Sequence, residues 1–105
     1  MKNFLMVVAA MAGLALAGGA HADAAKAKAL AQSKNCLACH AIDKKLVGPA
    51  FTEVAKKYKG DAGASANLVT KIIKGGGGVW GTIPMPPNPV SQDESKLLAD
   101  WILSM

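Results

Sequence analysis

Arginine is absent from the sequence, and the net charge of +5 comes from 12 lysines set against 7 acidic residues. The chain also lacks a run of basic residues with interleaved aromatic residues, which is the usual pattern of a nucleic-acid-binding surface. We therefore expect no nucleic-acid partner. An excess of lysine instead favours protein partners with acidic surfaces, which it attracts by electrostatic steering.

Cysteine is equally scarce, since Cys36 and Cys39 are the only two in the chain. A disulfide between them would close a very small loop and would constrain the unfolded chain little. A zinc site needs four ligands, and the sequence has no second cysteine pair. A thioredoxin-like redox pair would lie near a βαβ pattern, and the sequence shows no strand pattern. The two thiols are therefore expected to hold something else.

Long hydrophobic runs are also missing, because the apolar run Phe4–Ala17 is shorter than the ~20 residues that a membrane-spanning helix needs. This run follows a short positive start and precedes small residues at Ala20 and Ala22, which is the layout of a secretory signal peptide. We expect residues 1–22 to be cleaved, leaving one domain over residues 23–105 without stable membrane insertion. An uncleaved membrane anchor is the alternative. One of the 12 lysines lies in this leader, so the domain has 11 lysines, 7 acidic residues and a net charge of +4.

The remaining sequence predicts a small all-α domain of about four helices. Residues 23–33 are alanine-rich with an acid at the start, and apolar residues recur with helical spacing over 51–58 and about 64–74. Ser91 to Glu94 form a capping-box pattern that opens a last helix. Between the third and fourth helices, residues 75–90 are rich in glycine and proline. An irregular loop of this length in a compact domain is usually functional.

The stretch Cys36-Leu37-Ala38-Cys39-His40 is a C-x-x-C-H motif, the attachment signature of c-type haem. Two thiols at this separation add across the two vinyl groups of the porphyrin, and the adjacent histidine then falls beneath the iron. Export favours this reading, since haem attachment takes place outside the cytoplasm. A covalently bound porphyrin would also enlarge the core of a domain that is small enough to need such help. We expect one covalently bound haem c, with His40 as an axial ligand.

The second axial ligand decides the function, because a haem with two strong ligands moves electrons, whereas an open site binds gases or substrates. Met85 and Met105 are the candidates in the domain, and Met105 is the last residue. Met85 lies within Ile83–Pro89, a segment with four prolines that is stiff and loses little entropy on ordering. We therefore expect Met85 to bind the iron. The alternative is an apolar filler at Met85, which would leave a haem enzyme or gas sensor with an open sixth site.

From Ala24 to Ser104 the chain resembles the small bacterial class I cytochromes c, of the cytochrome c-551 (cytochrome c8) family. The resemblance depends on five motifs in order: CLACHAID, VGPAF, GVWG, IPMPPN and ADWILS. It implies helices wrapped around one haem, with the first and last helices crossing. Leu30 on the first helix and Leu97 and Trp101 on the last would make that contact.

The resemblance also assigns ligands and supporting residues. Cys36 and Cys39 would carry the thioether bonds, and His40 and Met85 would bind the iron. The carbonyl of Pro49 would accept a hydrogen bond from the His40 ring, which fixes the tautomer and raises the basicity of the ligand.

Three further residues are implied around these ligands. Asn88 would form a hydrogen bond near the sulfur of Met85. Trp80 would donate its indole N–H to a haem propionate, although an ordinary core aromatic is the alternative. Lys71 stands where relatives often have an arginine near a propionate, and it keeps the charge but loses the bidentate fork.

These expectations together describe a monomeric periplasmic electron carrier that is not an enzyme and that cycles between Fe(II) and Fe(III). Apolar residues would keep water from the porphyrin: Leu46, Val47, Phe51 and Ile83. Lysines near the attachment turn would dock acidic patches of redox partners at the exposed haem edge: Lys34, Lys44 and Lys45. The resemblance implies partners in respiration or denitrification, such as a nitrite reductase or a terminal oxidase.

Overall fold

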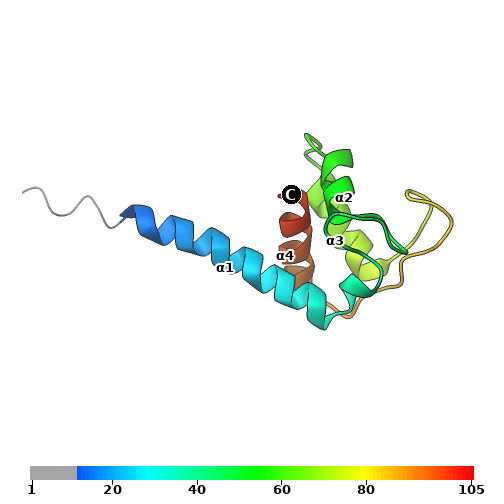
Figure 1. Cartoon of the computed structure of the whole chain (residues 1–105), viewed down its shortest axis with the longest axis horizontal. Coiled ribbons are helices and arrows are strands. Elements are labelled where there is room, and N and C mark those ends of the chain that lie inside the picture. The colour runs from blue at the N-terminus through cyan, green and yellow to red at the C-terminus, as the bar shows by residue number, and fades with distance from the viewer. Residues whose placement is uncertain (1–11) are drawn as a thin grey trace, which may run out of the picture.

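The computed structural model describes residues 12–105, with side chains described from Asp23 onward. Four α-helices and one short 3₁₀ turn make up this part of the chain (Figure 1): α1 (Ala12–Ser33), η1 (Cys36–Ala38), α2 (Phe51–Lys57), α3 (Ala64–Lys74) and α4 (Gln92–Leu103). No β-strand occurs between residues 12 and 105, and an isolated antiparallel bridge joins Gly76 to Met85. The predicted all-α fold and the long irregular segment before the last helix are confirmed.

Helix α1 begins earlier than the sequence analysis predicted. It runs from Ala12 to Ser33 without a break and passes through the expected cleavage point after Ala22. Figure 1 shows its N-terminal part extending away from the other helices. Residues 1–11 of the expected signal peptide lie outside the described residues, so cleavage stays a prediction. None of the helices described here is both long and apolar enough to cross a membrane.

Local signals set the ends of the other helices. Ser91 caps α4 because its hydroxyl accepts a hydrogen bond from the Glu94 amide, while the Glu94 carboxylate accepts one from the Ser91 amide. Each of these bonds satisfies an amide that a helix start leaves without a partner. Helix α3 ends at Gly75, which has a φ of +71°, in the left-handed region that favours glycine. Asn35, at a φ of 60°, turns the chain from α1 into the attachment turn.

Helix α4 is the centre of the packing and contacts α1, α2 and α3. Two groups of buried residues form the core, which we call the first and second core clusters. The first contains Ala31, Val69, Ile72, Leu98 and Ala99, and the second contains Phe51, Val54 and Ile102. Cys36, Leu68 and Trp101 pack against both clusters. The attachment turn is therefore anchored where the two clusters meet.

The crossing of the first and last helices is confirmed. Leu30 of α1 and Trp101 of α4 both pack against the first core cluster. Leu30 and Leu97 also line a common groove between the two helices. Within the core, the fully buried Ser95 of α4 donates its hydroxyl to the Val69 carbonyl of α3 at 2.9 Å, so no buried polar group is left without a partner there.

Candidate haem-binding site

The C-x-x-C-H motif forms a single tight turn. The amides of Cys39 and His40 both donate to the Cys36 carbonyl, at 3.3 and 3.0 Å. No disulfide joins Cys36 to Cys39, and both residues are half-buried. Burial raises the pKa of the Cys36 thiol, although a backbone hydrogen bond opposes the effect. A redox-active cysteine pair normally needs a lowered thiol pKa, so this turn is better suited to holding a group than to thiol exchange.

The segment that follows the motif folds back onto it. The Gly48 amide donates to the Cys39 carbonyl at 2.7 Å, and the Phe51 amide donates to the Ala41 carbonyl at 2.9 Å. These bonds tie the start of α2 to the attachment turn. They also bring Pro49 close to His40, although nine residues separate the two in the sequence.

The His40 ring is held in one tautomer. Its Nδ1 lies 2.8 Å from the Pro49 carbonyl oxygen, which is the hydrogen bond that the resemblance implies. A carbonyl oxygen can only accept, so Nδ1 carries a proton, and in the neutral ring Nε2 then keeps its lone pair. The backbone of Gly48 lies directly against the ring, since a Cβ there would be 2.6 Å from Cε1. His40 therefore presents a nitrogen that is ready to bind a metal.

Met85 is fixed by its backbone in the long loop. Its amide donates to the Gly76 carbonyl and its carbonyl accepts from the Gly76 amide, each at 2.9 Å. Its side chain is half-buried and packs against the first core cluster. Met105, by contrast, is an exposed residue at the chain end.

Asn88 braces the same loop in a way that the resemblance did not imply. Its side-chain amide donates to the Ile72 carbonyl of α3 at 2.9 Å and to the Pro86 carbonyl at 3.4 Å. The loop that carries Met85 is thus attached to α3 by a side chain as well as by the Gly76 bridge. A hydrogen bond from Asn88 toward the Met85 sulfur stays a prediction.

Trp80 has 42% of its area exposed and belongs to neither core cluster. The ammonium group of Lys57 in α2 lies 5.6 Å from the centre of the Trp80 ring system. No sequence pattern near Lys57 indicates this contact, because it forms only when α2 and the loop come together in the fold. The Lys71 ammonium lies against the backbone of Gly76, 3.1 Å from where a Cβ would stand. The propionate roles of Trp80 and Lys71 stay predictions.

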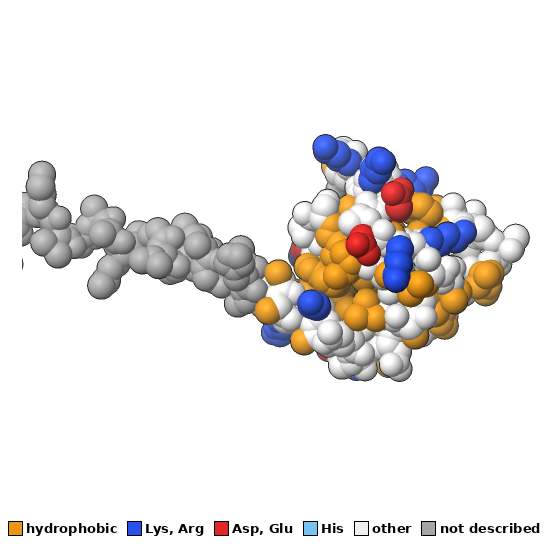
Figure 2. All heavy atoms as spheres, in the orientation of Figure 1, with side chains coloured by type: hydrophobic (Ala, Val, Ile, Leu, Met, Phe, Trp, Pro, Cys, Tyr) orange, Lys and Arg blue, Asp and Glu red, His pale blue; other side chains and the backbone are white. Residues whose placement is uncertain are grey.

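Large apolar side chains are exposed mainly in the two loops that carry His40, Pro49, Trp80 and Met85. Between 40% and 67% of their area is exposed: Ile42, Leu46, Val47, Val79, Trp80 and Ile83. Figure 2 shows one face of the molecule, where hydrophobic side chains gather with lysines beside them. Exposed apolar residues concentrated in these two loops indicate a surface that another group covers. Of the predicted apolar shell, Phe51 is buried in the core, whereas Leu46, Val47 and Ile83 are exposed on the protein surface.

These residues fit a covalently bound porphyrin. The chain offers two thiols in one turn, an imidazole with a free Nε2, a thioether on a braced loop and an apolar surface. Among the described residues there is no cluster of three or more His, Cys, Asp or Glu that could hold a metal ion, so the zinc alternative has no support in this part of the chain.

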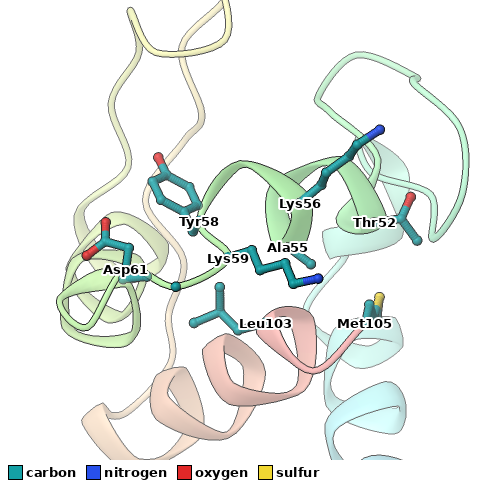
Figure 3. A pocket seen from close by; sticks show the side chains of 10 residues that line it. Thr52, Ala55, Lys56, Tyr58, Lys59, Asp61, Leu103 and Met105 are labelled. Carbon is teal, nitrogen blue, oxygen red and sulfur yellow. The ribbon is translucent and has the colours of Figure 1, made fainter.

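A hollow of about 500 Å³ lies elsewhere, between α2 and the C-terminal end of α4 (Figure 3). Lys56, Tyr58, Lys59, Leu103 and Met105 line it together with smaller residues, and no predicted haem residue does. Charged side chains border it: Lys56, Lys59 and Asp61. We assign the haem site from the chemistry of the side chains rather than from this hollow.

Comparisons with known proteins show the family of the chain. The model of the family described as Cytochrome c matches residues 24–105. Cytochrome c-551 of Pseudomonas aeruginosa is 50% identical over 104 residues, which cover 99% of this chain and 98% of that protein. Cytochrome c-552 of Hydrogenobacter thermophilus is 48% identical over 106 residues, covering 100% of this chain and 99% of that protein.

Solved structures agree as well. The crystal structure of wild-type cytochrome c552 of Nitrosomonas europaea matches with a TM-score of 0.71 at 50% identity, covering 73% of this chain and 96% of that chain. Because the family model spans the domain and relatives about half identical align over nearly their whole length, the chain belongs to the cytochrome c family and is a monohaem electron-transfer protein with one covalently bound haem c.

Proposed function

We propose that this cytochrome is a periplasmic electron carrier, not an enzyme, whose haem iron is bound on one side by His40 and on the other by Met85. The observation that carries the proposal is the fixed tautomer of His40, whose Nδ1–H donates to the Pro49 carbonyl at 2.8 Å and leaves Nε2 free. The bound haem supplies an iron that alternates between the ferrous and ferric states. A Met/His ligand pair raises the reduction potential, which suits a carrier of electrons.

Met85 is the methionine best placed for the second bond. Its backbone is paired with Gly76, and its side chain is half-buried against the first core cluster. A ligand held in this way gives up little freedom when it binds, because the fold has already fixed it. We assign the thioether bonds to Cys36 and Cys39, and the occupied sixth position is what separates a carrier from an enzyme or a gas sensor.

Trp80 and Lys71 are assigned to the propionates, and Asn88 to support of Met85. Trp80 keeps an exposed indole in the long loop, and Lys71 extends from α3 to the start of the same loop. An indole N–H and an ammonium are both donors suited to a carboxylate. Asn88 supports Met85 at least through the bond from its amide to the Ile72 carbonyl.

The signal-peptide pattern of residues 1–22 supports a periplasmic location, which c-type haem attachment also requires. Lys44 and Lys45 are exposed and are followed directly by the exposed Leu46 and Val47, whereas Lys34 is half-buried near Glu94. This arrangement of charge beside apolar surface supports transient docking of a monomer to acidic redox partners. A nitrite reductase or a terminal oxidase is the kind of partner that we propose.

The optical spectrum of the exported protein tests the proposal. We expect a red protein that stays red in acid acetone, because the thioethers to Cys36 and Cys39 cannot be extracted. A weak charge-transfer band between the Met85 sulfur and ferric iron should be visible, and the Met85→Ala variant should lose it. Ready binding of carbon monoxide or cyanide by the unmodified protein would instead support the enzyme or gas-sensor alternative.

A further inference from the structure

Three aromatic rings from distant parts of the chain form a continuous chain behind the proposed axial ligand. The rings of His40 and Phe51 are stacked, with centroids 5.1 Å apart and planes inclined by 21°. The ring of Phe51 meets Trp101 edge to face, at 5.7 Å and 68°. Both separations lie in the favourable range for aromatic pairs. The chain of rings therefore connects the attachment turn, through the first residue of α2, to α4.

The stacking does something that the Pro49 hydrogen bond does not. The χ2 torsion of histidine has a broad distribution. A single hydrogen bond at Nδ1 therefore leaves the ring able to tilt about that contact. A ring stacked on His40 resists this tilt over its whole face. Gly48 adds a second steric limit, because it lies so close to the imidazole that a Cβ there would be 2.6 Å from Cε1.

Phe51 is itself firmly held, which a positioning residue must be. Only 4% of its area is exposed, and its amide donates to the Ala41 carbonyl at 2.9 Å. It belongs to the second core cluster with Val54 and Ile102, against which Trp101 also packs. Phe51 can therefore move only if α2 or α4 moves with it.

We propose that Phe51 is a positioning residue that sets the plane of the His40 imidazole, and that Trp101 holds Phe51 in that position. The inference rests on the proposed binding of iron by His40. The last helix thus has a role beyond crossing α1, because its packing fixes the orientation of the ligand ring. The alternative is that Phe51 only fills the core. In that case it would contribute to stability but would not affect the orientation of the His40 ring.

Proton NMR of the oxidised holoprotein reads the orientation directly, because the shifts that ferric iron induces at the haem methyls depend on the directions of the axial ligand planes. We compare Phe51→Leu and Trp101→Leu with Val54→Ala, a control in the same helix and core cluster as Phe51. Phe51→Leu should change the methyl pattern and the His40 ring shifts. Trp101→Leu should change them in the same sense but less, and Val54→Ala should leave them near those of the unmodified protein.

A Phe51→Leu protein with unchanged methyl and His40 shifts would overturn the proposal. If this variant does not fold, Trp101→Leu decides the matter, and unchanged shifts in it count equally against the proposal. The unmodified protein separates this result from a failure of the proposed function. If it lacks iron-shifted signals from the His40 ring and the Met85 methyl, the ligand assignment is wrong, whereas normal signals there and no response to the variants reject only the role of Phe51.

Discussion

Gly76 and Met85 hold each other through a pair of backbone hydrogen bonds, each 2.9 Å long. Gly75, the residue before the bridge, passes so close to Met85 that a Cβ there would collide with the Met85 carbonyl oxygen and lie 2.8 Å from the Pro86 carbonyl carbon. The glycines after α3 are therefore more than a flexible entry to the loop. They allow the chain to approach the backbone of the proposed ligand.

We predict that Gly75→Ala weakens the bond between Met85 and the iron. The substitution puts alanine at a φ of +71° and a ψ of −160°, a region almost restricted to glycine, which costs about 1–3 kcal/mol, and it also pushes the Met85 backbone away. Gly60→Ala is the matched control, since Gly60 has a φ of +80° with nothing within 4 Å of its added Cβ. Guanidinium unfolding should show a loss in both variants, and only Gly75→Ala should weaken the charge-transfer band. Equal bands in the two proteins would contradict the role of Gly75.

Lys57 and Trp80 should be energetically coupled. An ammonium over an aromatic ring at an exposed site contributes about 0.5–1 kcal/mol, and this contact joins α2 to the loop that carries Met85. A double-mutant cycle with Lys57→Gln and Trp80→Leu should measure a coupling of roughly that size in the free energy of unfolding. Lys56→Gln in place of Lys57→Gln is the control and should give additive losses. Additive losses with Lys57→Gln as well would show that the contact does not stabilise the fold.

The pH dependence of stability should include a contribution from Asp100. Hydrogen bonds from Lys96 at 2.7 Å and from Ser65 at 2.8 Å lower the pKa of this carboxyl below its ordinary value. A lowered pKa in the folded state gives stability that is present above the ordinary pKa and is lost as the pH falls through the lowered value. Because the side chains of the Lys96–Asp100 pair are 64% and 51% exposed, we expect this pair to contribute less than about 1 kcal/mol to the free energy of unfolding at neutral pH.

Asp100→Asn should therefore reduce the free energy of unfolding at neutral pH, and the difference from the unmodified protein should shrink in acid. Asp43→Asn removes the same charge from an exposed loop position and serves as the control. Urea unfolding over a pH series measures the free energy of unfolding of both variants. A difference for Asp100→Asn that does not depend on pH would contradict the ionic origin of the stabilisation.

Lys44 and Lys45 should accelerate electron transfer to an acidic partner. Replacing both by glutamate should slow the second-order rate about tenfold or more at low ionic strength, and added salt should reduce the effect. Lys28→Glu with Lys74→Glu makes the same change in net charge at exposed positions in α1 and α3. Stopped-flow oxidation by the partner enzyme is the measurement. Equal slowing in the two double variants would point to net charge rather than to a docking site.

Features that depend on nearby residues could be predicted from the sequence. Helix α3 occupies 64–74 as predicted, because its apolar spacing and the following glycine are local signals. The Ser91 capping box is local as well. The attachment motif is a property of five consecutive residues, so the cofactor followed from the sequence and the family comparisons bear it out. In the full chain α1 begins at Ala12 and not at Asp23, because the alanine- and leucine-rich residues before Asp23 also favour helix, whereas the predicted start at Asp23 applies to the cleaved domain.

Contacts between distant segments could not be read in the same way. No local pattern brings Phe51 onto His40 or Lys57 onto Trp80, because these pairs form only when α2 packs against the rest of the domain. Asn88 shows the same limit. Its side-chain amide has two donors, and the fold directs it to the Ile72 and Pro86 carbonyls, which sequence spacing alone does not reveal.

The visible absorption spectrum of the oxidised, exported protein tests the ligation of the iron by His40 and Met85 most directly. The ligand assignment predicts a weak sulfur-to-iron charge-transfer band that disappears in Met85→Ala, from a haem that acid acetone cannot remove. A protein that lacks this band while it is folded and oxidised, or one whose Met85→Ala variant keeps it, would contradict that account.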